Sequence, residues 1–424
     1  MVAHLPVIPA LVYGRGAMKT ALVGGVLIDG TGGSPRADTT LVIDGPRIEA
    51  VCRERAFGPD VRLVDLAGGF VLPGLIDCHV HLAPWGLNLA AHQDKRLMHL
   101  AAETVLALRT TVAAGCTTAR DLGGLDAGFR DAVARGLIAG PRLQVSVVIV
   151  SPTNGIADAT TGQGLASPVV PGMPDPQCDG PYGVRAKVRE VLRAGADVIK
   201  IATSGGVSSP RLDPRRPIFT REEIEAVVDE AHMAGVPVAC HALGGPGLLR
   251  AVRAGVDTIE HGAWLDEECV AEMARRGTWY VPTLAIYHWH ATRGNEQKQA
   301  RARGLLEAHR RSLALALRAG VRVALGTDSG GYGYGETALE LALMVEAGMT
   351  PAGAIEAGTR RAAECLGLER EVGTLEPGKV ADLVVVDADP LEDVGVLNQV
   401  AHRALVMKGG VPVGGTGLGD RPNG

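Results

Sequence analysis

The sequence predicts an α/β protein made of a (β/α)8 TIM-like barrel and a small β-sandwich domain formed from both termini. In the middle of the chain, apolar strand-like segments alternate with amphipathic helical segments, the pattern of a parallel sheet covered by helices. Near both ends, short apolar segments are separated by Gly, Asp and Pro instead. With 424 residues, the chain is long enough for a barrel with one added domain.

The two terminal segments share one sequence pattern. "TLVIDGPRIEAV" near the start and "GTLEPGKVADLVVVDADP" near the end are both short, apolar and punctuated by turn residues. We therefore expect residues 1–73 and 371–424 to form the small β-sandwich domain together. Residues 1–17 contain two prolines and little periodicity, and we expect them to be a poorly ordered extension.

The middle segment, residues 74–370, is expected to be the barrel. Several of its helices end in Ala-Gly directly before a strand, which is a helix stop signal. Its strand region has about the length of an eight-stranded barrel, roughly 250 residues. The expected strands are residues 74–82, 116–123, 143–150, 197–205, 237–243, 258–262, 279–284 and 322–330.

The composition of the chain excludes some classes of binding partner. A net charge of -5 with 21% charged residues gives no basic surface, so we expect no nucleic acid. No run of 18 apolar residues occurs, so we expect no membrane span. Seven cysteines without a CxxC pair indicate reduced core residues in a cytoplasmic protein. We therefore expect the protein to act on a small-molecule substrate and to form a homo-oligomer.

Polar side chains recur where the expected barrel strands end. "GLIDCHVHLAP" places His79 and His81 two residues apart, hence on one face of a strand. The carboxyl ends of barrel strands form the active-site face. A lone histidine pair is more often packed than metal-bound, so the other strand ends have to supply further ligands. The candidates at those ends are Lys200, His241, His261 and Asp328.

Lys200 is the most informative of these candidates. In "DVIKIA" it lies within an apolar strand, where an unpaired ammonium is costly. A neutral lysine can add carbon dioxide and become a carbamate, an anion whose two oxygens can bridge two metals. The alternative is a lysine paired with a buried carboxylate.

The stretches "PGLIDCHVHL", "GADVIKIATSGG", "VACHA", "DTIEHG", "LGTDSG" and "GTLEPGKVADLVVVD" resemble the binuclear branch of the amidohydrolase superfamily. The resemblance implies two divalent metals and a carbon dioxide-derived carbamate on Lys200 that bridges them. It assigns His79 and His81 to the buried metal, His241 and His261 to the more exposed one, and Asp328 to the first metal and to proton transfer. Zinc suits imidazole and carboxylate ligands best, with manganese, cobalt and iron as alternatives.

Within the superfamily, the chain looks most like Xaa-Pro dipeptidases, N-acyl amino-acid hydrolases and ochratoxin-type amidases. The resemblance therefore implies cleavage of an amide bond in an N-acyl amino acid or a dipeptide-like substrate. Two positions depart from many dipeptidase members, because Ile156 and Tyr334 stand where histidines are expected. An apolar pocket favours an acylated nitrogen over a free substrate ammonium.

Three further residues are candidates for substrate contact. Arg211 follows the fourth expected strand and offers a cation for a substrate carboxylate, although a solvated basic loop is the simpler interpretation. Tyr287 and His288 follow the seventh expected strand, near the barrel mouth. One alternative function is a cyclic-amide hydrolase of the imidazolone or hydantoin type. Another is a catalytically silent barrel scaffold, and the intact set of six candidate ligands disfavours this second alternative.

Overall fold

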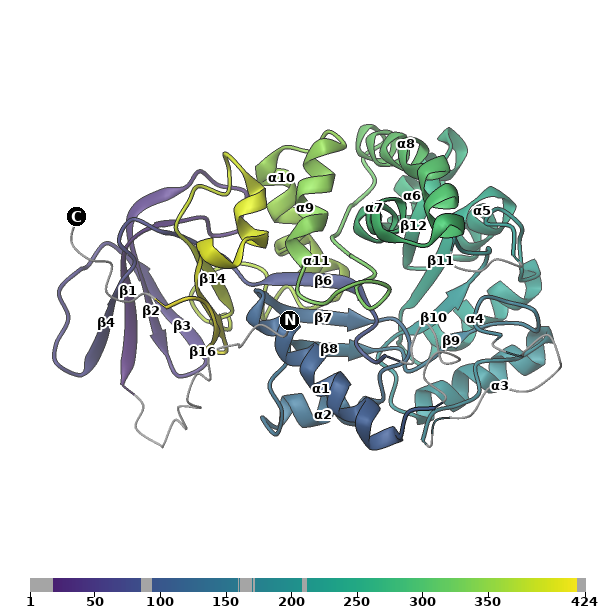
Figure 1. Cartoon of the computed structure of the whole chain (residues 1–424), viewed down its shortest axis with the longest axis horizontal. Helices are drawn as coiled ribbons and strands as arrows, with labels where there is room; N and C mark the ends of the chain where they lie inside the picture. Colours follow the sequence, from purple (N-terminus) through teal and green to yellow (C-terminus); the bar gives the residue numbers. More distant parts are fainter. Residues whose placement is uncertain are drawn as a thin grey trace.

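The computed structural model of the chain describes residues 18–84, 94–158, 160, 170, 172–207 and 212–417. Strands from the two ends of the chain lie together at one side of the molecule, and the parallel strands and most helices fill the rest (Figure 1). The α/β class with parallel sheets is thereby confirmed. The expected extension, residues 1–17, lies outside the described residues.

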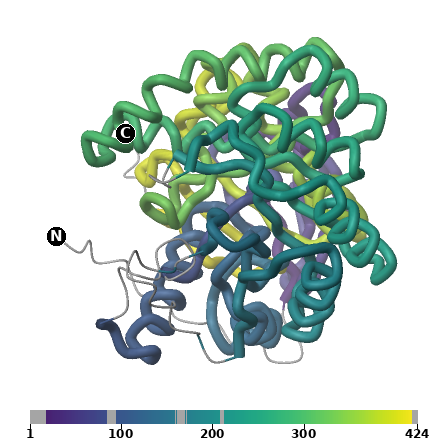
Figure 2. The backbone as a smooth tube through the Cα atoms, turned by 90° about the vertical axis from the view of Figure 1, so that its right-hand side faces the viewer, coloured from purple at the N-terminus to yellow at the C-terminus, as the bar shows by residue number. Residues whose placement is uncertain are grey.

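The terminal segments form one sheet of eight strands. Its order is β16-β15-β14-β5-β1-β2-β3, with β4 paired to β1. β14 pairs antiparallel with β5, and this pairing joins the two ends of the chain. The purple and yellow segments accordingly lie next to each other in the side view (Figure 2). The strands are β1 (Lys19–Leu27), β2 (Arg36–Asp44), β3 (Arg47–Cys52), β4 (Val61–Asp65), β5 (Phe70–Pro73), β14 (Leu383–Val386), β15 (Arg403–Lys408) and β16 (Val411–Gly414).

β14 is buried on both faces, which explains its unbroken apolar sequence. Alternate residues of a strand point to opposite faces. Leu383 and Val385 belong to the apolar core of the terminal sheet, whereas Val384 and Val386 belong to the large core of the rest of the molecule. This strand therefore packs the terminal sheet directly against the part that carries the parallel strands.

The middle of the chain forms two parallel sheets, β6-β7-β8 and β13-β12-β11-β10-β9. The expected strand 143–150 is split in two at Val147, whose φ is +65°. The strands are β6 (Leu75–Val80), β7 (Cys116–Asp121), β8 (Arg142–Val145), β9 (Ile149–Val150), β10 (Ile199–Ala202), β11 (Val238–Gly244), β12 (Thr258–Trp264) and β13 (Trp279–Val281).

The eighth expected strand, residues 322–330, does not form a continuous ladder. It makes isolated parallel bridges at Val323 with Tyr280 and at Ser329 with Val80. Backbone hydrogen bonds also run from Ala324 N to Tyr280 O (3.0 Å) and from Cys78 N to Leu325 O (2.9 Å). The segment thus lies between β13 and β6 and connects the two parallel sheets.

Helices follow or precede the parallel strands. The Ala-Gly pairs act as predicted at the ends of α4 and α8, where Gly235 and Gly320 have φ values of +73° and +72° directly after the last turn. None of the helices in the described ranges combines the length and the hydropathy needed to cross a bilayer. The helices are α1 (Leu97–Ala113), α2 (Ala127–Ala134), α3 (Gly180–Arg193), α4 (Arg221–Met233), α5 (Gly245–Ala254), α6 (Glu267–Arg276), α7 (Leu284–Arg293), α8 (Glu296–Arg318), α9 (Thr337–Glu346), α10 (Pro351–Ala357) and α11 (Arg360–Cys365), with 3₁₀ turns at Val394–Asn398 and Val400–His402.

Candidate metal centre

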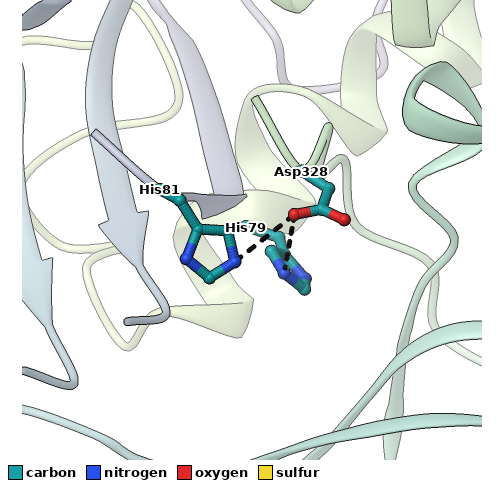
Figure 3. Close-up of side chains that lie close together, drawn as sticks. All are labelled: His79, His81 and Asp328. Atoms are coloured by element: carbon teal, nitrogen blue, oxygen red, sulfur yellow. Dashed lines mark ion pairs between the residues drawn. The ribbon is translucent and has the colours of Figure 1, made fainter. Parts of the chain in front are cut away.

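His79 and His81 lie at the carboxyl end of β6 and are both buried. Their Nε2 atoms lie 3.6 Å and 3.3 Å from Oδ1 of Asp328 (Figure 3). One ligand atom from each of the three residues lies within 4.8 Å of the other two. Two imidazoles and a carboxylate that converge in this way form a group able to hold a divalent metal ion.

The segment that carries Asp328 reaches this position by close backbone contact with β6. The backbone N–H of Asp328 donates to the carbonyl of His79 at 2.7 Å, and Asp328 itself has a φ of +59°. A Cβ atom on Gly330 would lie 1.9 Å from the carbonyl oxygen of His81. Only glycine fits there, which gives a physical reason for the second glycine of "GTDSG".

The charges in this group are strongly coupled. Burial alone would raise the pKa of Asp328, but its contact with His81 and the charges of His79 and Lys200 lower that pKa to about 2. Burial and the charge of Lys200 hold the pKa of His79 well below its usual value. Burial also lowers the pKa of His81, but the contact with Asp328 and its negative charge have the larger effect, so the pKa of that ring is raised. At neutral pH, Asp328 is therefore an anion that faces the two rings.

The outer nitrogen of each ring has its own partner. His79 Nδ1 lies 2.8 Å from Oε2 of Glu260, and His81 Nδ1 lies 2.8 Å from the carbonyl oxygen of Gly123. Both partners accept hydrogen bonds, so each Nδ1 carries a proton. In the neutral ring, Nε2 is then the nitrogen that can bind a metal, whereas a protonated His81 donates from Nε2 to Asp328. Such outer partners set the tautomer of a metal-binding histidine.

Two further histidines, on β11 and β12, lie beside this group. The ring centroid of His261 is 4.9 Å from that of His79 and 4.4 Å from that of His241. His261 Nδ1 contacts Thr283 Oγ1 at 2.7 Å, and His241 Nε2 contacts the Gly205 carbonyl at 3.0 Å. Nε2 of His261 and Nδ1 of His241 are therefore the nitrogens left for a ligand role.

Burial is the first cause of the low basicity of these two rings. It lowers the pKa of His241 to about 4, and it holds the pKa of His261 well below its usual value. Both rings are therefore neutral at neutral pH, which is the form that binds metals. His261 has a φ of +75°, and backbone strain of this kind is concentrated at functional sites.

Lys200 lies on β10 between β9 and β11 and is 1% exposed. Its Nζ has no hydrogen-bond partner among the described residues. Burial lowers its pKa to about 8, although the charges of Glu260 and Asp328 act in the opposite direction. A lysine of this kind has an accessible neutral form. The alternative from the sequence, a direct pair with a buried carboxylate, is absent within the described part of the chain.

The predicted substrate residues are distributed differently. The Tyr287 ring lies 5.7 Å from that of His261, between the site and α8. Ile156 lies against Gly206, since a Cβ there would be 2.9 Å from Ile156 Cδ1 and 3.5 Å from His241 Cε1. Tyr287 and Ile156 thus border the β11–β12 side of the site.

The other three predicted substrate residues are not brought to the histidines by any described contact. Tyr334 is half-buried, and burial together with the charges of Asp121 and Glu103 raises its pKa to about 12, which associates it with β7 and α1. His288 lies on α7, after the seventh expected strand, and it is half-buried. Arg211 lies outside the described residues.

Sequence reasoning missed Glu260, Arg120 and Thr283. Glu260 and Arg120 are charged residues inside apolar strands and are almost fully buried. This is the signal that drew attention to Lys200, and it was available in "DTIEHG" and "CTTARDLG". Thr283 carries no such signal, because its contact with His261 depends on a left-handed backbone (φ +54°) at the start of α7.

An α/β fold with histidine and carboxylate side chains gathered at the ends of parallel strands is the arrangement of a protein that binds a metal ion in its strand-end site. Residues 70–413 match the model of the amidohydrolase family, and the chain belongs to that family. The predicted membership is confirmed, and with it the prediction of a metal-dependent hydrolase that acts on an amide C–N bond.

Three relatives place the chain within the family. It is 33% identical to an ochratoxinase of Aspergillus niger over 95% of this chain and 88% of the relative. A crystal structure of an Xaa-Pro dipeptidase with bound methionine superposes with a TM-score of 0.84, at 33% identity over 93% of this chain and 99% of that one. A prolidase complexed with n-methylphosphonate-l-proline gives a TM-score of 0.86, at 33% identity over 94% and 100% of the two chains.

Proposed function

We propose that the protein hydrolyses the amide bond of an N-acyl amino acid or of a dipeptide-like substrate. The convergence of His79, His81 and Asp328 on one point carries the proposal. The relatives support the substrate class, since ochratoxinase, an Xaa-Pro dipeptidase and a prolidase are all among the proteins that match over most of this chain.

The donor set fits two divalent metal ions. His79, His81 and Asp328 would hold the first, and His241 and His261 the second, with Lys200 as a carbamate between them. Lys200 Nζ, a buried polar atom without a hydrogen-bond partner in the described chain, supports this arrangement. Zinc is the proposed metal, because imidazole and carboxylate donors suit it best.

When bound, the two ions lower the pKa of water and polarise a substrate carbonyl. Asp328 supplies the proton transfer: its carboxylate is anionic at neutral pH and accepts a proton from water, which it then donates to the leaving nitrogen. Tyr287, buried against His261, closes one wall of the site and limits water there. Each of these roles belongs to a side chain whose position is set by an element of the fold.

Ile156 gives the site an apolar wall next to His241. An apolar wall offers no hydrogen-bond partner to a free substrate ammonium. Burial of a neutral polar group without a partner costs roughly 2 to 7 kcal/mol, and burial of an unpaired charge costs more. N-acyl amino acids, whose nitrogen is neutral, are therefore the proposed better substrates.

The finer architecture is also a proposal. The segment 322–330, which joins β13 to β6, supports a closed eight-stranded barrel over residues 74–370. The terminal sheet and its separate apolar core support a β-sandwich-like domain of residues 1–73 and 371–424. Seven unpaired cysteines support a reducing, cytoplasmic location. The homo-oligomer stays a prediction, which sedimentation of the purified chain would test.

The decisive experiment combines metal analysis with a substrate panel. We expect two equivalents of zinc per chain and hydrolysis of N-acyl amino acids, measured as release of the free amino acid. A fully active protein with one equivalent would contradict the two-metal arrangement. Activity confined to cyclic amides would replace the proposed substrate class with the alternative one.

A further inference from the structure

A chain of three buried residues lies beneath the candidate metal centre. His79 on β6 contacts Glu260 on β12, and Glu260 contacts Arg120 on β7. His79 Nδ1 lies 2.8 Å from Glu260 Oε2, and Arg120 Nη2 donates to Glu260 Oε1 at 2.9 Å. All three side chains are at most 1% exposed. β12 is thereby joined through side chains to the neighbouring strands β6 and β7 of the other parallel sheet, directly behind one proposed ligand.

Both oxygens of the Glu260 carboxylate have hydrogen-bond partners. Oε2 accepts from His79, and Oε1 accepts from both Arg120 and the hydroxyl of Thr258. Arg120 in turn donates through Nε to the carbonyl of Cys78 at 2.8 Å, one residue before His79. The guanidinium therefore holds both the carboxylate that orients the His79 ring and the backbone that carries it.

We infer that Glu260 and Arg120 are positioning residues for His79. Glu260 keeps the proton on Nδ1 and points Nε2 toward Asp328, and Arg120 keeps Glu260 in place. The inference rests on the proposed ligand role of His79, but it concerns two residues that the ligand set does not include.

Electrostatics explains why the carboxylate needs the arginine. A buried ion is stable only when it is paired and fully hydrogen-bonded, and removal of one partner leaves an uncompensated charge. The planar guanidinium offers several donors in a fixed fork, so it can contact Cys78 O, Thr258 Oγ1 and Glu260 Oε1 at once. A lysine carries its three N–H donors on one nitrogen, so it lacks the separation between Nε and Nη2 that these contacts use.

The first test is Glu260→Gln in the metal-loaded protein, with zinc affinity measured by competition with a chelator. The amide offers one acceptor instead of two, so either His79 or Arg120 loses its partner. We expect zinc to bind about 10- to 100-fold more weakly at one of the two sites. Unchanged zinc affinity at both sites would overturn the inference.

A matched control separates positioning from general destabilisation. Glu230 on α4 is also a buried carboxylate paired with arginines, Arg185 and Arg189, but it lies on the outer helices. Glu230→Gln should lower the melting temperature and leave zinc affinity unchanged. If the two glutamine variants lose zinc affinity equally, the effect of Glu260 is only structural and the inference is wrong.

A second pair of variants tests whether the two residues act as a unit. Arg120→Lys should weaken zinc binding, and Arg120→Lys combined with Glu260→Gln should be no worse than Glu260→Gln alone, because the second change removes the group that Arg120 holds. Additive losses of zinc affinity would contradict the inference that Arg120 acts on His79 through Glu260. If Glu260→Gln does not fold, Glu260→Asp keeps the charge but shortens the side chain, and it should show the same loss of zinc affinity.

His79→Ala distinguishes this inference from the proposed function. Unchanged zinc stoichiometry in that variant would refute the metal site itself. Loss of zinc in His79→Ala together with wild-type affinity in Glu260→Gln would leave the metal site standing and refute only the positioning role.

Discussion

The two sides of the candidate metal centre differ in how many of their proposed metal ligands the unmodified side chains already supply. On the β6 side, His79, His81 and Asp328 bring three ligand atoms within 4.8 Å, and the anion is already present. On the β10–β12 side, His241 and His261 lie with ring centroids 4.4 Å apart, and the third candidate, Lys200, is an amine with no hydrogen-bond partner among the described residues.

The two sides are built by different means. The β6 side is held by the backbone contact of Asp328 with His79 and by outer partners on both rings. Asp328 is an anionic ligand on the β6 side, whereas the β10–β12 side has oriented rings but no carboxylate among its proposed ligands. An anion there would offset part of the charge of a divalent ion. Carboxylation of Lys200 would supply that anion, so the second side is expected to depend on a chemical change that the first does not need.

The largest effect is expected for Lys200→Ala. Without the proposed bridging anion, the zinc content should fall from two equivalents toward one, because the β6 side keeps His79, His81 and Asp328. Activity should fall by more than the factor of about 10² to 10⁴ expected for loss of proton transfer alone. Elemental analysis and turnover measure both quantities, and short carboxylic acids should restore part of the activity. A fully metallated, active Lys200→Ala protein would show that the two sides do not differ in this way.

Asp328→Asn tests the other side. The amide can still act as a weak ligand, but it cannot accept a proton at neutral pH. We expect much of the zinc to remain and kcat to fall by about 10² to 10⁴. Metal content and kcat should be measured on the same preparation. Near-normal kcat would mean that another group transfers the proton and that the β6 side has only a binding role.

Ile156→His examines specificity at the wall beside His241. A polar ring there can interact with a substrate ammonium, so kcat/KM for a dipeptide should rise relative to that for the matching N-acyl amino acid. A tenfold change in that ratio corresponds to about 1.4 kcal/mol. Ile156→Leu keeps the wall apolar and serves as the control. An unchanged ratio in the histidine variant would show that Ile156 does not face the substrate.

The smallest effect on activity is expected for Glu340→Gln, which acts on the support of the β12 side and changes the pH dependence of stability. Glu340 on α9 accepts from the backbone N–H groups of Leu284 (2.8 Å) and Ala285 (2.7 Å), directly after Thr283, which contacts His261. Burial raises its pKa from the model-compound value of 4.5 to about 8. Between these pH values the folded protein retains a proton that the unfolded chain has released.

The stability contributed by the protonated Glu340 is thus fully present below about pH 4.5 and is lost as the pH rises to about 8. Glu340→Gln lacks this titration. The free energy of unfolding of the unmodified protein should therefore decline relative to that of the variant by up to about 1.4 kcal/mol per pH unit within this window. Urea unfolding at several pH values between 5.5 and 8 measures the difference. A constant difference would mean that Glu340 is already ionised throughout.

Much of the architecture was predictable because it follows from local patterns. The apolar runs near both ends predicted strands of one small domain, and the structure shows these strands in one sheet. The Ala-Gly pairs marked helix ends. The third expected strand was wrong as a single unit, because a left-handed residue at Val147 splits it into β8 and β9. The eighth expected strand forms only isolated bridges, because close contact with β6 replaces a regular ladder over residues 322–330.

The sequence by itself determined which residues stand at the strand ends, because strand periodicity and turn residues are local properties that a single segment carries. His79, His81, Lys200, His241, His261 and Asp328 could all be named in this way. Only the tertiary structure decided which distant side chains meet: Glu260 and Arg120 reach His79 from separate strands, and Thr283 reaches His261 through a left-handed turn. Such contacts depend on the order and register of strands, and no local pattern specifies them.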